Sequence, residues 1–336
     1  MSNKTVIIAE AGVNHNGDLD QAKKLIEAAA SSGADYIKFQ TFTAEQLVTP
    51  EAHKAEYQKN ASDDKETQYE LLNKLELSEE DHFELLNYAN TLGIKFLSTG
   101  FDINSVKFLM QLGQKIIKIP SGEITNRPYL QYVGSLRKEV ILSTGMSTLL
   151  EVENAIEIIT NFGTPRELLT VLHCTSEYPT PMSDVNLLAM VNMREKLKIN
   201  VGYSDHTLGI VVSIAAVALG AKVIEKHITL DKNLPGPDHQ ASILPTELRE
   251  MVSAIRSIEI ALGRPNKMPT EFEMLNRTAT RKSIIAKRNI MKGEILTEEN
   301  ITVKRPGNGL SPMLWPNIIG TNAVRNFIKN ELIEIL

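Results

Sequence analysis

Short apolar segments alternate with amphipathic, helix-like segments along the first 262 residues. The pattern predicts eight strands, each followed by a helix, at residues 5–9, 35–40, 95–99, 115–120, 139–144, 169–175, 200–203 and 222–228. Strict alternation is typical of a parallel sheet, and eight units favour closure into a (β/α)8 TIM barrel. An open doubly wound sheet is the alternative, but no Gly-x-Gly-x-x-Gly turn follows the first predicted strand.

A polar residue lies at or near the end of every predicted strand. These residues are Glu10, Lys38, Thr99, Lys118, Ser143, His173, His206 and His227. In a parallel barrel the carboxyl ends of all strands meet at one rim, where barrel enzymes carry their active sites. The sequence therefore predicts a functional site at this rim.

The pattern changes after a last barrel helix predicted at residues 247–262. Residues 263–280 are rich in Pro, Asn, Arg and Thr with little periodicity, which indicates a linker. Residues 281–336 combine short β-type segments with turn signals at Lys292-Gly293 and at residues 306–309. We expect three parts: a barrel at 1–262, a linker at 263–280, and a small β-rich domain at 281–336.

Composition and charge exclude several classes of protein. The chain is 42% hydrophobic and carries a formal charge of -5, which argues against a nucleic-acid or anionic-membrane surface. The single cysteine, Cys174, excludes an internal disulfide framework and fits a reducing compartment. No apolar run approaches the ~20 residues of a spanning helix, and the first residues do not resemble a secretion signal. We expect a cytoplasmic protein.

Two histidines make the strongest chemical signal. His206 and His227 follow neighbouring predicted strands, so both imidazoles reach the same edge of the sheet. Imidazole is the commonest ligand of divalent metals, and two with carboxylates nearby suit a catalytic metal. The alternative is that each is an ordinary core or surface histidine. Strand alternation puts Glu225 on the same face as His227 and Lys226 on the opposite face.

Lysines and hydroxyls near the strand ends indicate an anion site. A lysine that points into a barrel is costly unless it meets an anion, which applies to Lys38 and Lys118. The hydroxyls of Ser121 and Ser143 lie beside glycine turns that can cradle a phosphate. An internal ion pair between Lys38 and Glu10 is the alternative.

Three carboxylates complete the predicted site. Glu10, Glu123 and Asp238 follow strands or lie in rim loops. Each is able to hold a metal-bound water or to act as a general acid or base.

Several motifs resemble one enzyme family. They are AEAGVNHNG, KFQTF, KIPSGE, ILSTGM, HCTSEYPTP, GYSDHT, IEKHITLD and PGPDH, in order along the chain. They resemble the sialic acid synthases, a family that includes legionaminic and pseudaminic acid synthases. KRPGNG at residues 304–309 resembles that family's C-terminal antifreeze-like (SAF) domain. The resemblance covers essentially the whole chain.

The resemblance implies an N-acetylneuraminate synthase, a transferase that forms a carbon–carbon bond. Such enzymes condense phosphoenolpyruvate with the open-chain aldehyde of N-acetylmannosamine, release phosphate and form a nine-carbon 2-keto acid. The alternative is a legionaminic acid synthase, which uses 2,4-diacetamido-2,4,6-trideoxymannose in the same chemistry. The intact PGNG tail leans to the sialic branch, whereas Ser176 stands where several members have asparagine beside the sugar. A domain-swapped homodimer is also implied.

By similarity, His206 and His227 would bind Mn²⁺, with Mg²⁺ or Co²⁺ as alternatives. Glu10 and Asp238 would position a metal-bound water, and Glu123 would lie beside the reacting carbons. Each of these positions matches a family motif in this sequence.

The substrate contacts are also implied by similarity. The phosphate of phosphoenolpyruvate would be held by Lys118, Ser121 and Ser143, and its carboxylate by Lys38 and Thr99. The sugar would be contacted by three further residues: Gln40, Tyr178 and, from the small domain over the partner's barrel, Arg305.

Three other functions remain open from the residues alone. Lys38 or Lys118 could form a Schiff base in an aldolase. The chain could be a sugar- or partner-binding scaffold, although a scaffold gains nothing from so many charged strand ends. The same chemistry could also serve a different acceptor, giving a shorter 3-deoxy keto acid.

Overall fold

A computed structural model of the protein describes residues 4–54 and 66–335. The chain divides into two compact units, Met1–Gly263 and Arg264–Leu336. Each unit is described by itself.

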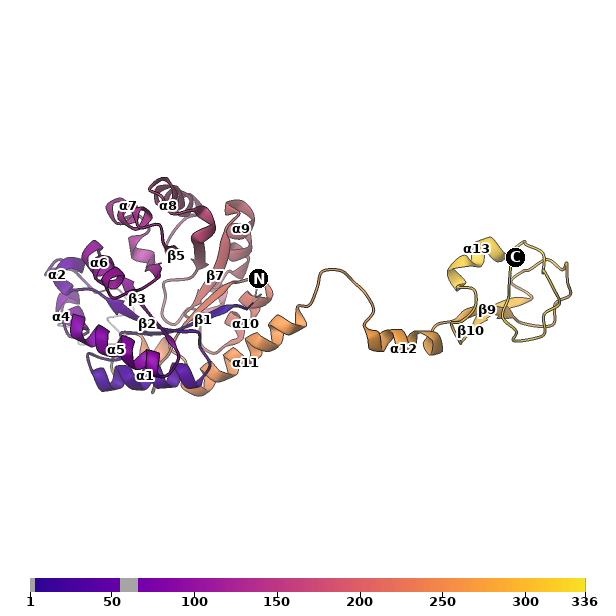
Figure 1. Ribbon diagram of the computed structural model, residues 1–336, viewed down its shortest axis with the longest axis horizontal. Coiled ribbons are helices and arrows are strands. Elements are labelled where there is room, and N and C mark those ends of the chain that lie inside the picture. Colours follow the sequence, from indigo (N-terminus) through magenta and orange to yellow (C-terminus); the bar gives the residue numbers. More distant parts are fainter. Residues whose placement is uncertain (1–3, 55–65, 336) are drawn as a thin grey trace. The chain divides into compact units, whose positions relative to one another are not determined.

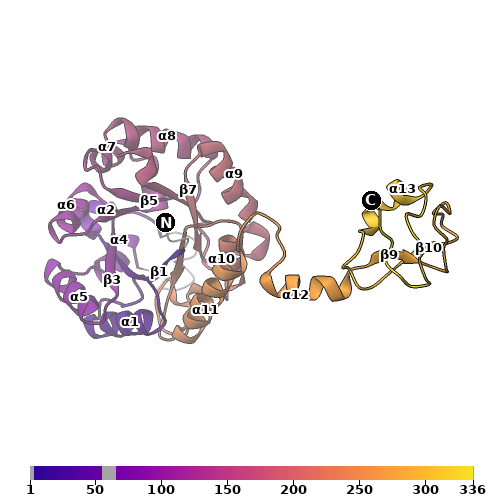
Figure 2. The ribbon, with the colours of Figure 1, turned by 45° about the vertical axis from the view of Figure 1, so that its right-hand side comes forward.

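The first unit is a closed barrel surrounded by helices (Figures 1 and 2). Its strands, as far as the chain is described, are eight in number, parallel, and paired in sequence order. They are β1 (Val6–Gly12), β2 (Tyr36–Thr41), β3 (Lys95–Gly100), β4 (Ile116–Ile119), β5 (Glu139–Ser143), β6 (Leu169–His173), β7 (Asn200–Asp205) and β8 (Val223–His227). The TIM barrel prediction is confirmed.

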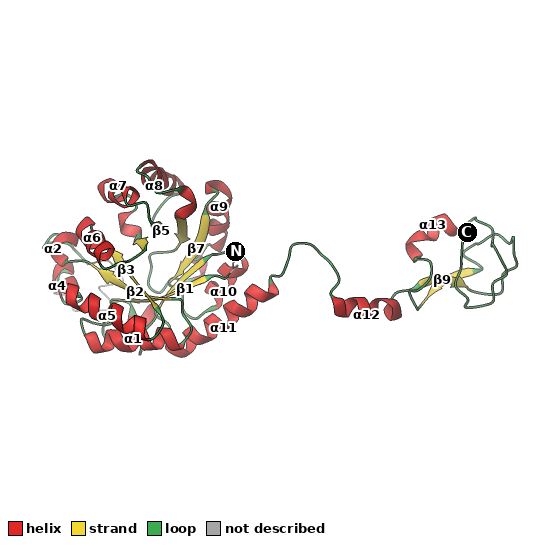
Figure 3. Ribbon diagram, viewed as in Figure 1, coloured by secondary structure: helices red, strands yellow, loops and turns green. Residues whose placement is uncertain are grey.

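Helices cover the outside of the barrel, as Figure 3 shows in red around the yellow strands. They are α1 (Leu19–Ser31), α5 (Glu79–Thr91), α6 (Ile103–Gln111), α7 (Arg127–Ser135), α8 (Leu149–Asn161), α9 (Leu187–Leu197), α10 (Val211–Ala218) and α11 (Pro245–Ala261). Capping residues in the sequence determine where several of these helices begin. Ser78, which precedes Glu80 and Asp81, matches the sequence pattern of a helix N-cap. Its hydroxyl accepts a hydrogen bond from the amide of Asp81, and the Asp81 side chain accepts one from the amide of Ser78, which is a capping box.

The barrel interior changes from apolar to polar along the strands. Ile8, Leu97, Ile141 and Val223 belong to an apolar cluster inside the barrel. Because side chains alternate across a strand, the residue two positions later points to the same side. Those residues are Glu10, Thr99, Ser143 and Glu225. The period of two therefore stacks a polar layer on the apolar one, toward the carboxyl ends of the strands.

An insertion between β2 and α5 contains two short helices, α2 (Ala44–Leu47) and α4 (Gln68–Asn73). Residues 41 to about 75 are polar with little periodicity, and this pattern predicts an irregular insertion. The two helices show that this prediction was wrong for their residues. A capping box between Thr67 and Glu70 starts α4. Apolar residues of the insertion, including Phe42 and Leu72, pack into a small cluster of their own, so both helices are supported by local burial.

The second unit has a small core of its own. Strands β9 (Ser283–Ala286) and β10 (Ile301–Lys304) pair antiparallel, as expected for a β-rich domain. Their apolar side chains pack with Phe327 and with Ile318 of α13 (Trp315–Ile318). The predicted linker contains a helix, α12 (Glu271–Thr280), started by a capping box at Thr270. That helix was not predicted, although Phe272 and Leu275 lie one turn apart on it; all its residues are exposed, so it has no buried face.

Candidate active site

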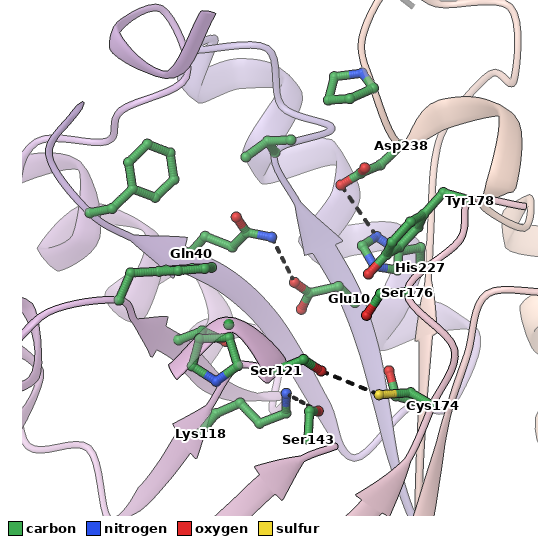
Figure 4. Close-up of a pocket in the computed structure, with 18 of the residues that line it drawn as sticks. Glu10, Gln40, Lys118, Ser121, Ser143, Cys174, Ser176, Tyr178, His227 and Asp238 are labelled. Carbon is green, nitrogen blue, oxygen red and sulfur yellow. Dashed lines mark hydrogen bonds and ion pairs between the residues drawn. The ribbon is translucent and has the colours of Figure 1, made fainter. Parts of the chain in front are cut away.

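A cavity of about 770 Å³ opens at the carboxyl ends of the barrel strands (Figure 4). All the site residues predicted within the barrel line it: Glu10, Lys38, Gln40, Thr99, Lys118, Ser121, Glu123, Ser143, Tyr178, His206, His227 and Asp238. Arg305 belongs to the second unit and is exposed just beyond β10. Strand ends far apart in sequence thus converge on one cavity.

The two predicted metal ligands lie side by side. The ring centroids of His206 and His227 are 5.5 Å apart. His206 Nδ1 lies 2.7 Å from the carbonyl oxygen of Thr175. Because a carbonyl can only accept, Nδ1 carries the proton, which leaves the lone pair on Nε2. His227 Nδ1 is buried without a hydrogen-bond partner, and it lies 3.7 Å from Asp238 Oδ2.

These imidazoles fit a divalent metal. Burial lowers the pKa of His206 to about 4 and that of His227 well below its usual value, so both rings are neutral at pH 7 and able to ligate. Within residues 4–54 and 66–335, no three His, Cys, Asp or Glu side chains form a complete ligand set. Two neutral imidazoles with Asp238 3.7 Å from one of them would leave positions for water or substrate on a bound ion.

The carboxyl groups of the cavity differ in pKa. Burial raises the pKa of Glu10 to about 7, with Glu225 adding to the rise and Lys38 opposing it. Burial likewise raises the pKa of Asp238 to about 6 and also raises that of Glu123. Burial would raise the pKa of Glu225 as well, but Lys118 and Lys38 outweigh it and lower that pKa. Carboxyl groups with separated pKa values can divide acid and charge-stabilising roles.

Two buried lysines share the floor of the cavity. Lys38 Nζ lies 2.8 Å from Glu10 Oε2 and 3.4 Å from Glu225 Oε2. The ion pair considered as the alternative for Lys38 is thus present. Lys118 Nζ lies 3.5 Å from Glu225 Oε1 and donates to Ser143 Oγ at 2.7 Å. Glu225 was not among the predicted site residues, although its position two residues before His227 puts it on the same face.

A hydroxyl-lined turn lies beside Lys118. Ser121 Oγ accepts a hydrogen bond from the amide of Gly145 at 2.9 Å and lies 3.4 Å from Cys174 Sγ. A β-carbon at Gly145 would lie 2.1 Å from Ser176 Oγ and 2.9 Å from Ser121 Oγ, so any larger residue here would displace both hydroxyls from the cavity turn. Sequence reasoning did not assign Cys174 to the site. Figure 4 shows Lys118, Ser121 and Ser143 facing the same space.

One side of the cavity is apolar. Tyr178 stacks on His206, with ring centroids 4.1 Å apart, and Gln40 Nε2 lies 3.5 Å from Glu10 Oε1. Beyond Gln40 is a surface that we call the apolar wall, made of Val13, Phe42, Leu47, Val48, Leu72, Leu75 and Phe101. The apolar wall was not predicted, because most of it comes from residues 41–75, whose pattern predicts irregular structure.

Comparison with known proteins identifies the class. Residues 25–267 match the NeuB family and residues 281–334 match the SAF domain. The chain belongs to the NeuB family and carries a C-terminal SAF domain, as the resemblance predicted.

Individual relatives are similar over nearly the whole chain. The N,N'-diacetyllegionaminic acid synthase of Campylobacter jejuni is 52% identical, over 98% of this chain and 99% of the relative. The human N-acetylneuraminate-9-phosphate synthase is 41% identical, over 98% and 92%. The crystal structure of N-acetylneuraminic acid synthetase from Leptospira borgpetersenii has a TM-score of 0.72 at 33% identity, over 82% and 91%. These relatives are synthases, and this chain is an enzyme.

No helix in the described part of the chain has both the length and the apolar character to cross a membrane.

Proposed function

We propose that the protein condenses phosphoenolpyruvate with the open-chain aldehyde of an N-acetylated mannose-type sugar and releases phosphate. One observation carries this proposal: two buried lysines and two neutral imidazoles line the same cavity. An enol phosphate brings negative charge that needs cations, and its carbon 3 is a modest nucleophile that needs an activated aldehyde. The enzyme is then a transferase that forms a carbon–carbon bond.

The metal that His206 and His227 would hold is Mn²⁺, with Mg²⁺ or Co²⁺ as alternatives. When bound, the ion would supply Lewis-acid polarisation of the aldehyde oxygen. Support comes from the neutral rings, from the lone pair on His206 Nε2 and from His227 Nδ1, which makes no hydrogen bond.

The phosphate of the substrate would lie against Lys118, Ser121 and Ser143, and its carboxylate against Lys38 and Thr99. Lys38 and Lys118 are both within 3.5 Å of Glu225, and Lys38 donates to Thr99 Oγ1 at 2.9 Å. Charged donors fixed in advance bind such an anion without reorganising.

The raised pKa values suit the remaining carboxyl groups to proton transfer. Glu10 and Asp238 would orient the water that attacks carbon 2, and Glu123 would lie beside the reacting carbons. Gln40 and Tyr178 would face the sugar. A closed, dry cavity would hold the open-chain form and limit side reactions.

For the acceptor we propose 2,4-diacetamido-2,4,6-trideoxymannose, so that the product is N,N'-diacetyllegionaminic acid. The apolar wall offers a surface for the acetamido methyl groups and the C6 methyl group of this sugar. The 52% identical relative from Campylobacter jejuni carries the corresponding name. N-acetylmannosamine is the second candidate, favoured by the similarity to the Leptospira borgpetersenii structure.

A phosphate-release assay tests the proposal. The chelator-treated enzyme receives phosphoenolpyruvate, each candidate sugar in turn, and each metal. We expect release only with sugar and metal together, and a higher kcat/KM for the diacetamido sugar. Trapping of a pyruvate adduct by borohydride, with full activity in chelator, would instead identify a lysine-dependent aldolase.

The SAF domain would complete the site of a partner subunit in a domain-swapped homodimer, with Arg305 reaching the sugar. Arg305 is exposed in the second unit, so its side chain is available for such a contact. Light scattering together with activity of a mixture of His206→Ala and Arg305→Ala subunits tests this proposal. Recovery of activity in the mixture is expected, because a mixed dimer would combine an intact barrel with an intact Arg305.

A further inference from the structure

The two histidine-bearing strands are joined on their outer face by a buried ion pair. Lys226 Nζ lies 3.0 Å from Asp205 Oδ2, and both side chains are fully buried, at 0% exposure. Asp205 directly precedes His206, and Lys226 directly precedes His227. The two residues are also paired in the β7–β8 register. The ion pair therefore lies immediately behind the two imidazoles.

The same pair holds the backbone after His206. Asp205 Oδ1 accepts hydrogen bonds from the amide and the hydroxyl of Thr207, at 2.9 and 2.8 Å. Lys226 Nζ donates to the carbonyl oxygen of Thr207 at 2.5 Å. Ser213 Oγ, from α10, donates to Asp205 Oδ2 at 2.6 Å. The residues on both sides of His206 are thus tied to β8 and to the helix layer.

We propose that the Asp205–Lys226 ion pair sets the separation and orientation of the His206 and His227 rings. Asp205 and Lys226 are positioning residues: they lie on the far side of the sheet and reach the cavity only through the backbone. A buried ion pair is weak evidence for stability but can fix one arrangement among several. The consequence for metal binding rests on the proposed function, whereas the ring geometry does not.

Metal affinity gives the first test. The double variant Asp205→Asn/Lys226→Met removes both charges and leaves neither buried charge unpaired. Its matched control is Asp35→Asn/Arg256→Met, which removes an ion pair at the opposite end of the barrel. Mn²⁺ titration of chelator-treated full-length protein should show a Kd raised by about 10–100-fold in the first variant and unchanged in the control. An unchanged Kd in a folded Asp205→Asn/Lys226→Met protein would overturn the proposal.

Imidazole NMR of the metal-free protein gives the second test. With ¹⁵N-histidine labelling, the double variant should shift the ring signals of His206 and His227 and leave those of His82 unchanged. Unchanged His206 and His227 signals would refute the proposal. If the wild-type protein binds no divalent metal, the proposed cofactor is wrong, and the NMR result alone decides the role of the ion pair.

A single substitution with a smaller effect on the ion pair tests the proposal even if the double variant misfolds. Ser213→Ala removes only the hydrogen bond to Asp205 Oδ2. It should move the same histidine signals in the same direction by a smaller amount. Absence of any shift, together with a folded protein, would count against the proposal.

Discussion

Ion pairs occur at both ends of the barrel, but in different surroundings. At the amino ends of the strands, Arg256 contacts Asp35 at 2.9 Å and Glu259 at 3.0 Å. Lys4 contacts Asp35 at 2.8 Å, and the amide of Ile7 donates to the same carboxylate. This network is partly exposed to solvent and ties the start of β1 to β2 and α11.

At the carboxyl ends, the charged groups are buried and incompletely satisfied. Among the residues described, five buried side-chain atoms lack a hydrogen bond of good geometry, and all lie at this end: Glu10 Oε2, Asn14 Oδ1, His15 Nε2, Glu225 Oε2 and His227 Nδ1. Two of them, Glu10 Oε2 and Glu225 Oε2, form ion pairs with Lys38 Nζ at 2.8 and 3.4 Å. Three of these five belong to residues that line the cavity. Buried polar atoms without partners are costly, and natural proteins retain them where a ligand supplies the missing contact.

The comparison separates stability from function within one fold. Partly exposed ion pairs at the amino end should contribute to folding, and the buried, incompletely hydrogen-bonded groups at the carboxyl end should contribute to binding and catalysis. Substitutions at the amino end should therefore lower stability and leave activity unchanged, whereas substitutions at the carboxyl end should mainly lower activity.

The largest effect on activity is expected at the imidazoles. His206→Ala or His227→Ala should lower the rate of phosphate release by about 10³-fold, the loss typical of removing one electrostatic stabiliser of a transition state. Thermal unfolding should change less for His227→Ala than for His206→Ala, because only His206 Nδ1 has a hydrogen bond to lose, to the carbonyl oxygen of Thr175. Full turnover in both variants would remove the metal from the proposal and revive a binding scaffold.

A smaller loss is expected at the anion site. Lys118→Met keeps the length of the side chain and removes its charge from the contacts with Glu225 and Ser143. The KM for phosphoenolpyruvate should rise by about 10²-fold, as expected for a charge-assisted contact worth ~3 kcal/mol, while the KM for the sugar stays within a few-fold. An equal rise in both KM values would show that the substitution disturbs the whole cavity instead.

A substitution in the second unit should have a smaller effect, and only on the KM for the sugar. Arg305→Ala should raise the KM for the acceptor by about 10-fold, the loss of one exposed hydrogen-bonded contact, with the KM for phosphoenolpyruvate unchanged. Arg305→Lys serves as the matched control, since it keeps the charge. An unchanged acceptor KM in Arg305→Ala would remove the proposed role of Arg305.

The smallest effect on activity is expected at the amino end. Asp35→Asn should leave kcat/KM unchanged and lower the free energy of unfolding by about 1 kcal/mol, a low value because solvent screens these charges. Burial opposes ionisation of Asp35, but Lys4, the Ile7 amide and Arg256 outweigh it and lower its pKa.

The same substitution predicts a pH dependence. A carboxyl group whose pKa is lower in the folded state stabilises the protein above its unfolded pKa, and the contribution is lost as pH falls through the folded pKa. The difference between wild type and Asp35→Asn should thus be complete at pH 7 and shrink below about pH 3.8. Denaturant unfolding at several pH values measures it. A constant difference down to pH 2 would contradict the assigned ion pairs.

Much of the barrel could be predicted because its signals are local. Strand alternation identified Lys226 as outward-facing, and the structure pairs it with Asp205 outside the barrel. The N-cap at Ser78 was also read correctly. The helices of the insertion were not predicted, because helices of four and six residues are too short to show an apolar period. Helix α12 was not predicted because the Pro, Asn, Arg and Thr residues of this segment indicate a linker, although Phe272 and Leu275 lie one turn apart on it.

The sequence predicted which residues of the site lie at strand ends, but not which of their side chains contact one another. Glu225 was visible beside His227, yet its central position between Lys38 and Lys118 depends on strands more than 100 residues apart meeting across the barrel. The apolar wall had no separate signal, because buried apolar side chains look alike in sequence wherever they pack.

The sequence by itself determined the elements: a period of two in the strands, caps at the helix starts, and histidines, lysines and carboxylates at strand ends. Only the tertiary structure decided which of these groups face one another and how burial shifts their pKa values. Closure of β8 onto β1 brings Glu10 level with His227, and the β7–β8 register sets Asp205 beside Lys226. The physical reason is that distances between distant segments, and the dielectric around them, arise only when the barrel closes.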